Sequence, residues 1–188
     1  MKKMLAINGS PRRTGNASKM LDIAIQRASR SGYCIEPFYL YEMKIAWCTG
    51  CMACKETGIC VIQDDIKGIR ESLLSCDLAV IVSPTYFANV SAPVKNMFDR
   101  LVGAIMDDNN SSIPKPRLSH NQEFILITTC NTPFPLNKFG GQSVGCLKSM
   151  YEFFHTSGMK CRGKITFAGT RGLDQVPERI VKKIERLI

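Results

Sequence analysis

Four cysteines lie within thirteen residues, in the pattern Cys48-x2-Cys51-x2-Cys54-x5-Cys60. Thiolates held this closely repel one another unless a cation neutralises them. An iron–sulfur cluster does so with four thiolate ligands, and ferredoxins use a related Cys-x2-Cys-x2-Cys run. Glycines within the segment allow the backbone to wrap around an object of that size. The pattern predicts that these four cysteines ligate a [4Fe–4S] cluster.

Two other interpretations of this cysteine loop, at about residues 45–63, stay open. Structural zinc sites with four cysteine ligands more often use two separated Cys-x2-Cys pairs, so zinc is the less favoured metal. The thiols could instead be free or reversibly oxidised. Clustered cysteines in a reducing compartment indicate metal or redox chemistry rather than disulfides. The five scattered cysteines are expected to be small buried hydrophobes: Cys34, Cys76, Cys130, Cys146 and Cys161.

A second candidate site is the segment Gly9-Ser-Pro-Arg-Arg-Thr-Gly-Asn16, the phosphate loop, between an apolar run and a helical pattern. A helix N-terminus offers unpaired N–H groups and a partial positive charge, which suit an anion. The patterns of nucleotide triphosphatases and of dinucleotide-binding folds are both absent from the sequence. A phosphomonoester such as that of FMN fits better, although an ordinary polar turn remains the alternative. The residues expected to bind it are Ser10, Arg12, Thr14, Gly15, Asn16 and Ser18.

A third segment, the ring loop at residues 84–91, follows the most apolar run of the chain. In an open α/β sheet, ligands bind outside the carboxyl ends of the strands, so this loop should lie beside the phosphate loop. It offers aromatic side chains and backbone amides to a flavin ring. The expected contacts are Pro84, Thr85, Tyr86, Phe87 and Asn89. A third loop, at residues 129–135, could close the pocket.

Strand and helix patterns alternate along the chain and must position these loops. Apolar strand-like runs are expected at residues 4–7, 33–40, 78–82, 124–128 and 164–168. Apolar residues spaced three and four apart predict helices over residues 17–28, 66–73, 94–105, 144–154 and 180–187. Asp64 or Asp65 and Ser91 are expected to cap two of them, and residues 107–122 to form a loop. Alternation of this kind predicts an α/β fold with a parallel sheet covered by helices on both faces.

Length and composition restrict the class of protein. The 188 residues suit a single domain over 1–188. Because no apolar run approaches the length needed to span a bilayer, and the first apolar run is too short for a signal peptide, we expect a cytoplasmic protein without membrane contact. The net charge of +9 suits anionic partners such as a nicotinamide dinucleotide or an acidic carrier. Dispersed basic residues argue against nucleic acid.

Taken together, these segments resemble the flavodoxin-like NAD(P)H-dependent FMN reductase superfamily, in its iron–sulfur flavoprotein branch. The phosphate loop, the compact cysteine pattern with the following Asp64 and Asp65, and Ser83-Pro-Thr-Tyr-Phe87 carry the resemblance. It extends from residue 1 to about residue 130. Lys95, Asp99 and Arg100 also match the family, and we interpret them as a solvated ion-pair face of a helix.

The resemblance implies a flavodoxin-like sheet of order 2-1-3-4-5, non-covalently bound FMN, and a homodimer or homotetramer. It also implies an enzyme, an FMN-dependent oxidoreductase that passes electrons from ferredoxin or NAD(P)H through FMN and a [4Fe–4S] cluster to a small-molecule acceptor. One alternative is a cluster-free NAD(P)H oxidoreductase acting on quinones, azo or nitro compounds. Others are a zinc-stabilised binding module and a non-enzymatic electron carrier.

Overall fold

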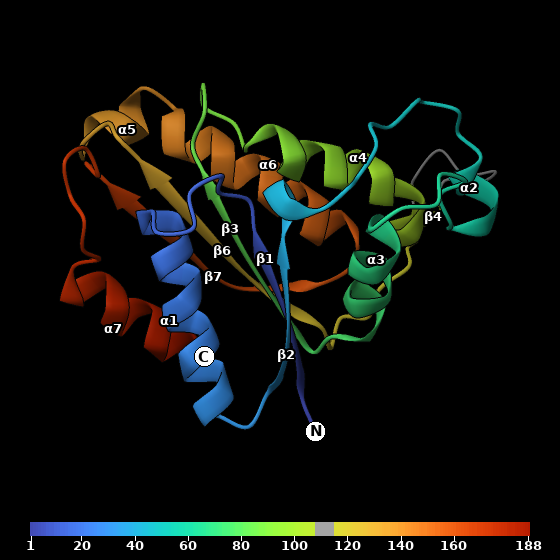
Figure 1. The fold of residues 1–188 in the computed structure, drawn as a ribbon, viewed down its shortest axis with the longest axis horizontal. Helices are drawn as coiled ribbons and strands as arrows, with labels where there is room; N and C mark the ends of the chain where they lie inside the picture. The colour runs from blue at the N-terminus through green and yellow to red at the C-terminus, as the bar shows by residue number, and fades with distance from the viewer. Residues whose placement is uncertain (108–114) are drawn as a thin grey trace.

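The computed structural model describes residues 1–107 and 115–188. Five parallel strands form its central sheet, in the order β2-β1-β3-β6-β7 (Figure 1). Numbered by their succession along the chain, these strands have the order 2-1-3-4-5, so the predicted flavodoxin-like topology is confirmed. Their bounds are β1 Lys3–Asn8, β2 Cys34–Tyr39, β3 Leu78–Pro84, β6 Glu123–Cys130 and β7 Lys160–Ala168.

The strand register brings the carboxyl ends to one edge of the sheet. Asn8 pairs with Tyr39 on one side and with Val82 on the other. Pro84 pairs with Thr129. The loops that follow β1, β3 and β6 therefore begin side by side, which is the arrangement that their sequence positions predicted.

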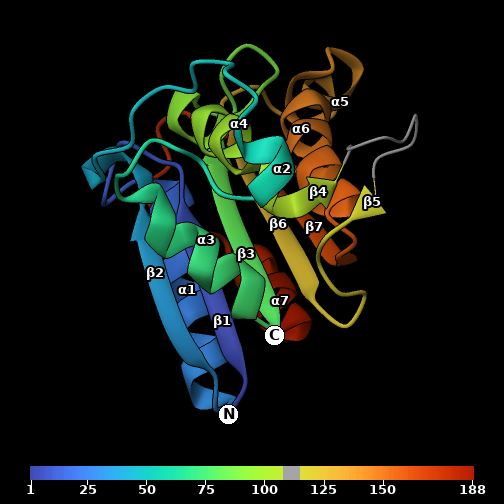
Figure 2. The same cartoon turned by 90° about the vertical axis from the view of Figure 1, so that its right-hand side faces the viewer.

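Helices cover both faces of the sheet (Figure 2). Helices α1 and α7 pack on one face, while α3, α4 and α6 pack on the other. The bounds are α1 Asn16–Arg30, α3 Ile66–Ser75, α4 Ala92–Ile105, α6 Gln142–Thr156 and α7 Glu178–Leu187. In the part of the chain that the structure describes, each of these long helices overlaps one of the five predicted ones, so their placement is confirmed.

The alternation of side chains along each strand supplies two separate hydrophobic cores. In β1, Leu5 and Ile7 pack with α3 and α4, whereas Met4 and Ala6 pack beneath α1. Successive side chains of a strand point to opposite faces, so a strand buried on both faces must be apolar throughout. This requirement explains why the inner strands β1, β3 and β6 read as nearly continuous apolar runs, whereas the less buried edge strands β2 and β7 include charged residues.

Several short elements were not predicted. They are η1 Leu40–Glu42, α2 Cys54–Thr57 inside the cysteine loop, and α5 Leu136–Phe139. Within the expected loop over residues 107–122, residues 108–114 lie outside the described part. The flanking residues form a small antiparallel pair, β4 Met106–Asp107 with β5 Lys115–Pro116.

The predicted helix caps occupy their positions but bond differently. Asp65 and Ser91 are the N-cap residues of α3 and α4, and neither side chain bonds its own helix. The Asp65 carboxylate instead accepts from the amide of Lys44 (2.6 Å), and the Ser91 hydroxyl donates to the carbonyl of Gly9 (2.7 Å). Tertiary partners have taken over these two side chains, whereas Asp64, the other residue expected to cap α3, does accept from the amide of Ile66 in its first turn (3.1 Å).

No helix in the described residues has the length and apolar character that crossing a membrane requires. Of the five scattered cysteines, Cys76, Cys130 and Cys146 are buried, as expected, while Cys34 and Cys161 are half-buried. Burial raises the pKa of the Cys76 thiol to about 12 and also raises the pKa of Cys146. These buried thiols are poor nucleophiles, because the thiolate is the reactive form.

Candidate functional site

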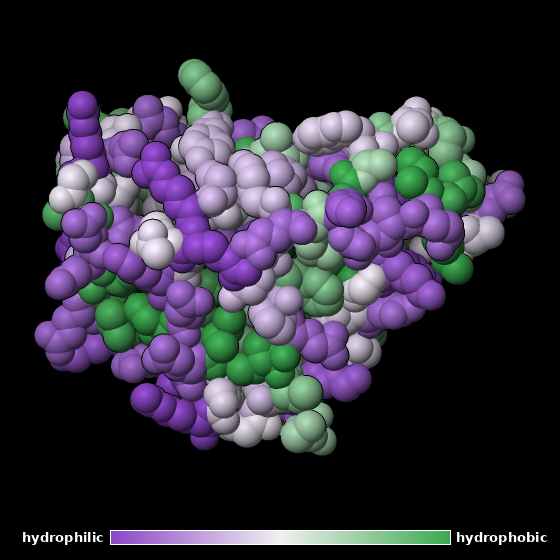
Figure 3. Space-filling view, in the orientation of Figure 1, coloured by the Kyte–Doolittle hydropathy of each residue, from purple (hydrophilic) through white to green (hydrophobic). Residues whose placement is uncertain are grey.

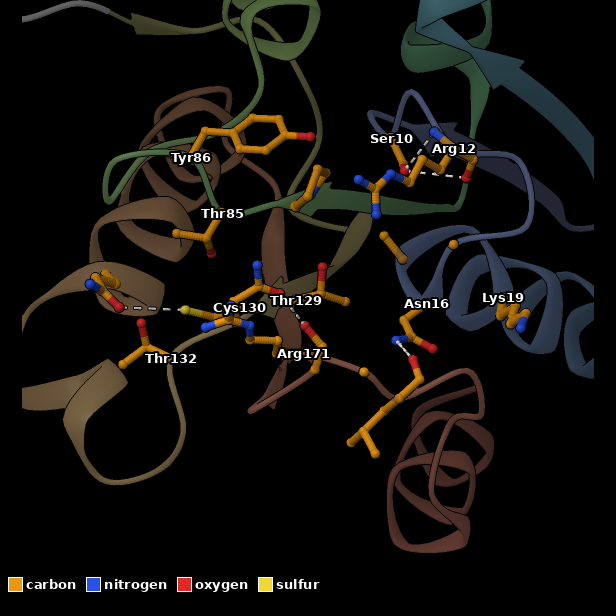
Figure 4. A pocket seen from close by; sticks show the side chains of 18 of the residues that line it. Ser10, Arg12, Asn16, Lys19, Thr85, Tyr86, Thr129, Cys130, Thr132 and Arg171 are labelled. Carbon is orange, nitrogen blue, oxygen red and sulfur yellow. Dashed lines mark hydrogen bonds between the residues drawn. The ribbon is translucent and has the colours of Figure 1, made fainter.

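A cavity of about 810 Å³ opens at the carboxyl edge of the sheet (Figure 4). Its volume lies in the range of small-molecule and cofactor sites. The phosphate loop forms one wall and the ring loop another, so the structure brings the two predicted segments together. Of the predicted cofactor-binding residues, the following line the cavity: Ser10, Arg12, Thr14, Gly15, Asn16, Pro84, Thr85, Tyr86 and Phe87.

The phosphate loop is held in shape by its own short contacts. The amide of Ser10 donates to Asn8 Oδ1 (2.8 Å), and the amide of Arg12 donates to Ser10 Oγ (3.2 Å). Helix α1 begins after Gly15, which has no side chain to cap it, and the first turn holds no acidic residue. The positive end of the helix dipole therefore faces the cavity without a competing carboxylate. Together with the Arg12 guanidinium, it suits an anion.

Asn16 and Ser18 occupy different positions relative to the cavity. Asn16 Nδ2 donates to the carbonyl of Leu173 (2.7 Å), while Asn16 Oδ1 is buried without a partner in the described residues. A buried acceptor of this kind suits a ligand hydroxyl. Ser18 is buried beneath the loop, where it accepts from Asn8 Nδ2 (2.9 Å) and donates to the Arg12 carbonyl (2.6 Å). It braces the loop and is not among the lining residues.

The ring loop contains a tight turn from Tyr86 to Asn89. The amides of these two residues donate to each other's carbonyls, both at 2.9 Å. Phe87 and Ala88 between them have φ angles of 47° and 60°. Two central residues with positive φ define the turn types that normally use Asn or Gly. Asn89 closes the turn through its backbone and does not line the cavity, while the Phe87 side chain is fully exposed at its tip.

Helix α6 supports this turn from behind. A Cβ atom on Gly145 would lie 2.1 Å from the carbonyl oxygen of Ala88. No side chain fits in that space, so the helix approaches the turn backbone-to-backbone. Thr85 Oγ1 also contacts Thr128 Oγ1 of β6 (2.9 Å). These contacts tie the ring loop to both β6 and α6.

A third wall of the cavity comes from residues that the sequence did not single out. The loop after β7 contributes Thr170 to Asp174, including Arg171, and Gln142 contributes from the start of α6. The end of β6 and the start of the loop after it, residues 129–132, also line the cavity, whereas residues 133–135 of the segment predicted to close it do not. Position after a parallel strand was the available signal for the β7 loop. Its residues lacked the motif that marked the other two loops.

The cysteine loop lies away from this cavity, against α4 and α3. Cys48 and Cys51 are exposed, and Cys54 and Cys60 are half-buried. Exposed apolar side chains accompany them in the cysteine loop: Trp47, Met52, Ile59 and Val61. Figure 3 shows apolar side chains gathered at the end of the molecule where α2 lies. Within residues 1–107 and 115–188, no three His, Cys, Asp or Glu side chains are grouped so as to hold a metal ion.

The thiol of Cys51 differs from the buried thiols of the core. Hydrogen bonds from the Ala53 amide and the Thr49 hydroxyl place the pKa of Cys51 below the ordinary cysteine value. A thiolate is the form that binds metal and attacks electrophiles. Cys51 therefore combines an exposed side chain with stabilisation of the anionic form.

The prediction that Arg100 belongs to a solvated ion-pair face is wrong. Lys95 and Asp99 do form an exposed pair one turn apart. The Arg100 side chain, however, is completely buried and bonds both carboxylate oxygens of Asp64, at 2.8 and 3.0 Å. The helical spacing placed the three residues correctly on α4 but could not show that the cysteine loop folds over one of them.

The buried pair predicts a pH dependence of stability. Burial alone raises the pKa of Asp64, but hydrogen bonds from Arg100 and from the amides of Ala46 and Ile66 outweigh it and hold the pKa below its ordinary value. The pKa of Asp64 is thus lower in the folded protein than in the unfolded chain, where it is about 4. Its carboxylate therefore stabilises the folded protein fully at pH values above about 4. That contribution is lost as the pH falls through the folded pKa.

Urea unfolding of metal-free protein from about pH 5 to about pH 2 tests this linkage. The wild-type free energy of unfolding should fall more steeply than that of Asp64→Asn, which keeps the side-chain shape but cannot ionise. Equal slopes for the two proteins would show that Asp64 is not the group responsible.

Comparison with known proteins agrees with this geometry. The sequence model of the NADPH-dependent FMN reductase family matches residues 2–116. An iron–sulfur flavoprotein of Archaeoglobus fulgidus is 40% identical over 100 residues, which is 53% of this chain and 46% of the relative. An iron–sulfur flavoprotein of Clostridioides difficile is 27% identical over 184 residues, 96% of this chain and 74% of the relative.

A solved structure shows the same fold at low identity. The FMN-dependent NADH-azoreductase from Bacillus anthracis, in complex with FMN, superposes with a TM-score of 0.73 over 99% of this chain and 95% of that chain, at 14% identity. The matches to four iron–sulfur flavoproteins cover only 46–52% of the length of each relative, so the chain spans about half the length of these proteins. On the match over residues 2–116, the chain belongs to the NADPH-dependent FMN reductase family.

Proposed function

We propose that the protein is an FMN-dependent oxidoreductase that carries a [4Fe–4S] cluster on its cysteine loop. The observation that carries the FMN assignment is the cavity of about 810 Å³, lined jointly by the phosphate loop and the ring loop, in a member of the FMN reductase family. The electron donor is NAD(P)H or ferredoxin, and the acceptor is a small molecule.

The residues present fit FMN at both of its ends. The uncapped start of α1, the Ser10 hydroxyl and the Arg12 guanidinium offer neutral and charged donors to the phosphate. The unpartnered Oδ1 of Asn16 offers an acceptor to a ribityl hydroxyl. Thr85, Tyr86 and the strained turn present side chains and backbone to the ring.

When bound, FMN supplies hydride and single-electron transfer. The protein orients it and determines which molecules reach it. The ring loop is braced by Thr128 and Gly145, so its backbone is held where an isoalloxazine ring would contact it. The β7 loop forms the third wall of the cavity and adds the cation of Arg171.

The donor set of the cysteine loop supports the second part of the proposal. Four thiols in a compact pattern match the ligands that a [4Fe–4S] cluster requires. The lowered pKa of Cys51 favours the thiolate. We propose Cys48, Cys51, Cys54 and Cys60 as the ligands, which requires the loop to draw its thiols together when the cluster is assembled. The relatives named iron–sulfur flavoproteins support the same assignment.

Further parts of the proposal concern organisation and partners. We propose a single flavodoxin-like domain over residues 1–188, in a homodimer or homotetramer that operates in the cytoplasm. The net charge of +9 supports an anionic electron donor, either a nicotinamide dinucleotide or an acidic protein carrier.

Protein purified without oxygen tests both assignments in one preparation. We expect stoichiometric FMN, iron and acid-labile sulfide, flavin absorption bands, and broad visible absorption from iron–sulfide charge transfer. FMN with steady NAD(P)H oxidation but without iron would identify a cluster-free reductase. Colourless protein with stoichiometric zinc would identify a binding module, and an inability to bind FMN would exclude the flavin assignment.

Replacing Cys51 by Ser should abolish cluster binding and leave FMN binding unchanged. The hydroxyl is a poor ligand for iron, and Cys51 is exposed on the cysteine loop, outside the cavity lining. Iron and FMN are measured on the same purified sample. Cys34→Ser, a half-buried cysteine in β2, is the matched control and should keep both. Full iron content in Cys51→Ser would rule out this residue as a ligand.

A further inference from the structure

One face of α4 contacts the cysteine loop at three places. Asn96, Arg100 and Gly103 are spaced four and three residues apart, so they share one side of the helix. Each of them contacts the loop at or beside a different cysteine: Cys48, Cys60 and Cys54 respectively. The helix thus meets the beginning, the end and the middle of the cysteine pattern.

Asn96 holds the beginning of the cysteine loop through hydrogen bonds. It is buried, and its Oδ1 accepts from the amide of Cys48 (3.1 Å). Its Nδ2 donates to the carbonyls of Ala46 (3.2 Å) and Ile45 (3.4 Å). The side-chain amide therefore satisfies backbone groups of Ile45, Ala46 and Cys48, which sets the direction in which the chain enters the pattern.

Arg100 joins the beginning of the loop to its end. Its Nη1 donates to the Ala46 carbonyl (2.5 Å), and its Nη2 donates to the Ile62 carbonyl (3.0 Å). Its Nε donates to Cys60 Sγ (3.2 Å). Asp64, which accepts from both terminal nitrogens, also accepts from the Ala46 amide (2.9 Å). The buried guanidinium therefore holds residues on either side of the pattern together.

Gly103 contacts the middle of the cysteine loop. A Cβ atom at this position would lie 2.2 Å from the carbonyl oxygen of Cys54. The short helix α2, which begins at Cys54, therefore packs directly on the backbone of α4. The fourth cysteine, Cys51, is exposed and lies between Gly50 and Met52, both of which have positive φ.

We propose that the Asn96–Arg100–Gly103 face of α4 is a template that positions Cys48, Cys54 and Cys60, and that Arg100 is a positioning residue for Cys60. The identity of the bound group rests on the proposed function. The template anchors the chain at three of the four proposed ligands, and their thiols, with that of Cys51 on the exposed turn, must still draw together when the group binds.

Arg100 also has an electrostatic consequence for whatever Cys60 holds. Hydrogen bonds to the sulfurs and local charge are among the factors that set the reduction potential of a cluster. The Nε–H donor and its buried positive charge favour the more negative, reduced state. A variant that removes this hydrogen bond should therefore lower the reduction potential of the cluster.

Arg100→Lys and Gly103→Ala test the template in the full chain reconstituted with iron and sulfide. Lysine keeps the charge but cannot bond Cys60, Asp64 and two carbonyls at once. We expect about 10–100-fold weaker retention of iron against a chelator, the usual effect of losing a group that orients a metal ligand. The potential of any remaining cluster in Arg100→Lys should be lower than in the wild type.

Gly68→Ala in α3 is the matched control, because its Cβ would lie 3.4 Å from the edge of the Phe38 ring, an ordinary contact. This control should retain iron like the wild type. FMN content, measured on every variant, reports that the domain remains folded, since the template lies outside the cavity lining. Wild-type iron retention in both Arg100→Lys and Gly103→Ala would overturn the proposal.

Hydrogen exchange of metal-free protein tests the template independently of any metal. The Cys48 amide should be protected in the wild type and exchange several-fold faster in Asn96→Ala, because its acceptor is Asn96 Oδ1. If wild-type protein takes up no iron, the cluster assignment fails, while slow exchange of this amide would still support the template. A Cys48 amide that exchanges equally fast in both proteins would overturn it.

Discussion

Gly145→Ala is expected to weaken FMN binding by at least about tenfold, equivalent to about 1.4 kcal/mol. The added methyl would lie 2.1 Å from the Ala88 carbonyl oxygen and 3.2 Å from the Ala88 Cβ, so either α6 or the ring loop must shift. Overpacking of this kind costs about 1–3 kcal/mol. Because the turn already holds Phe87 and Ala88 at positive φ, we expect the ring loop rather than α6 to shift.

Fluorescence titration of the FMN-free protein with FMN measures this effect, since bound flavin is quenched. Gly68→Ala is again the control, because it makes the same change within a helix without a close backbone contact. The free energy of unfolding of each FMN-free variant separates a local shift of the ring loop from general destabilisation. Wild-type affinity in Gly145→Ala would show that the ring loop does not contribute to the flavin site.

Arg100→Met is expected to lower the free energy of unfolding by about 3–5 kcal/mol, the usual result of removing one partner of a buried ion pair. The Arg100 side chain is completely buried and that of Asp64 is only 12% exposed. Without the guanidinium, the carboxylate remains largely shielded from solvent and loses two hydrogen bonds. The Ile62 carbonyl loses the Arg100 donor, and the Ala46 carbonyl keeps only the bond from Asn96. Urea unfolding of metal-free protein measures the loss.

A double-mutant cycle assigns this loss to the pair itself. Replacing both partners of a buried pair by apolar residues is often nearly neutral. Asp64→Leu combined with Arg100→Met should therefore be more stable than Arg100→Met alone. If the two losses simply add, the residues act independently and the packing of the arginine stem explains the effect of Arg100→Met.

The regular elements were largely predictable from residue order, because their patterns are local. The run Leu78 to Val82 has to be a strand buried on both faces, and the structure places each of these residues in the core. The apolar positions of α1, spaced three and four apart, became its buried face. Short helices such as α2 and α5 were not predicted, because four residues are too few to show the helical spacing of apolar side chains.

The candidate site was predictable where a loop had a recognisable motif and directly followed a strand. The phosphate loop and the ring loop met these conditions, and they line one cavity. The β7 loop, with Arg171, followed a strand but had no motif. The role of Ser18 as a brace beneath the phosphate loop depends on Asn8 and Arg12, which only the folded chain brings to it.

Residue order alone specifies the alternation of strands and helices, the two loops at the carboxyl edge, and the four closely spaced thiols. These features depend on residue types and short spacings, which persist whatever the rest of the chain does. The burial of Arg100 under the cysteine loop, and the close approach of distant backbone to Gly103 and Gly145, are apparent only in the folded chain. Such contacts arise when helices pack on a sheet, and a side chain's spacing within its own helix does not reveal which distant segment will cover it.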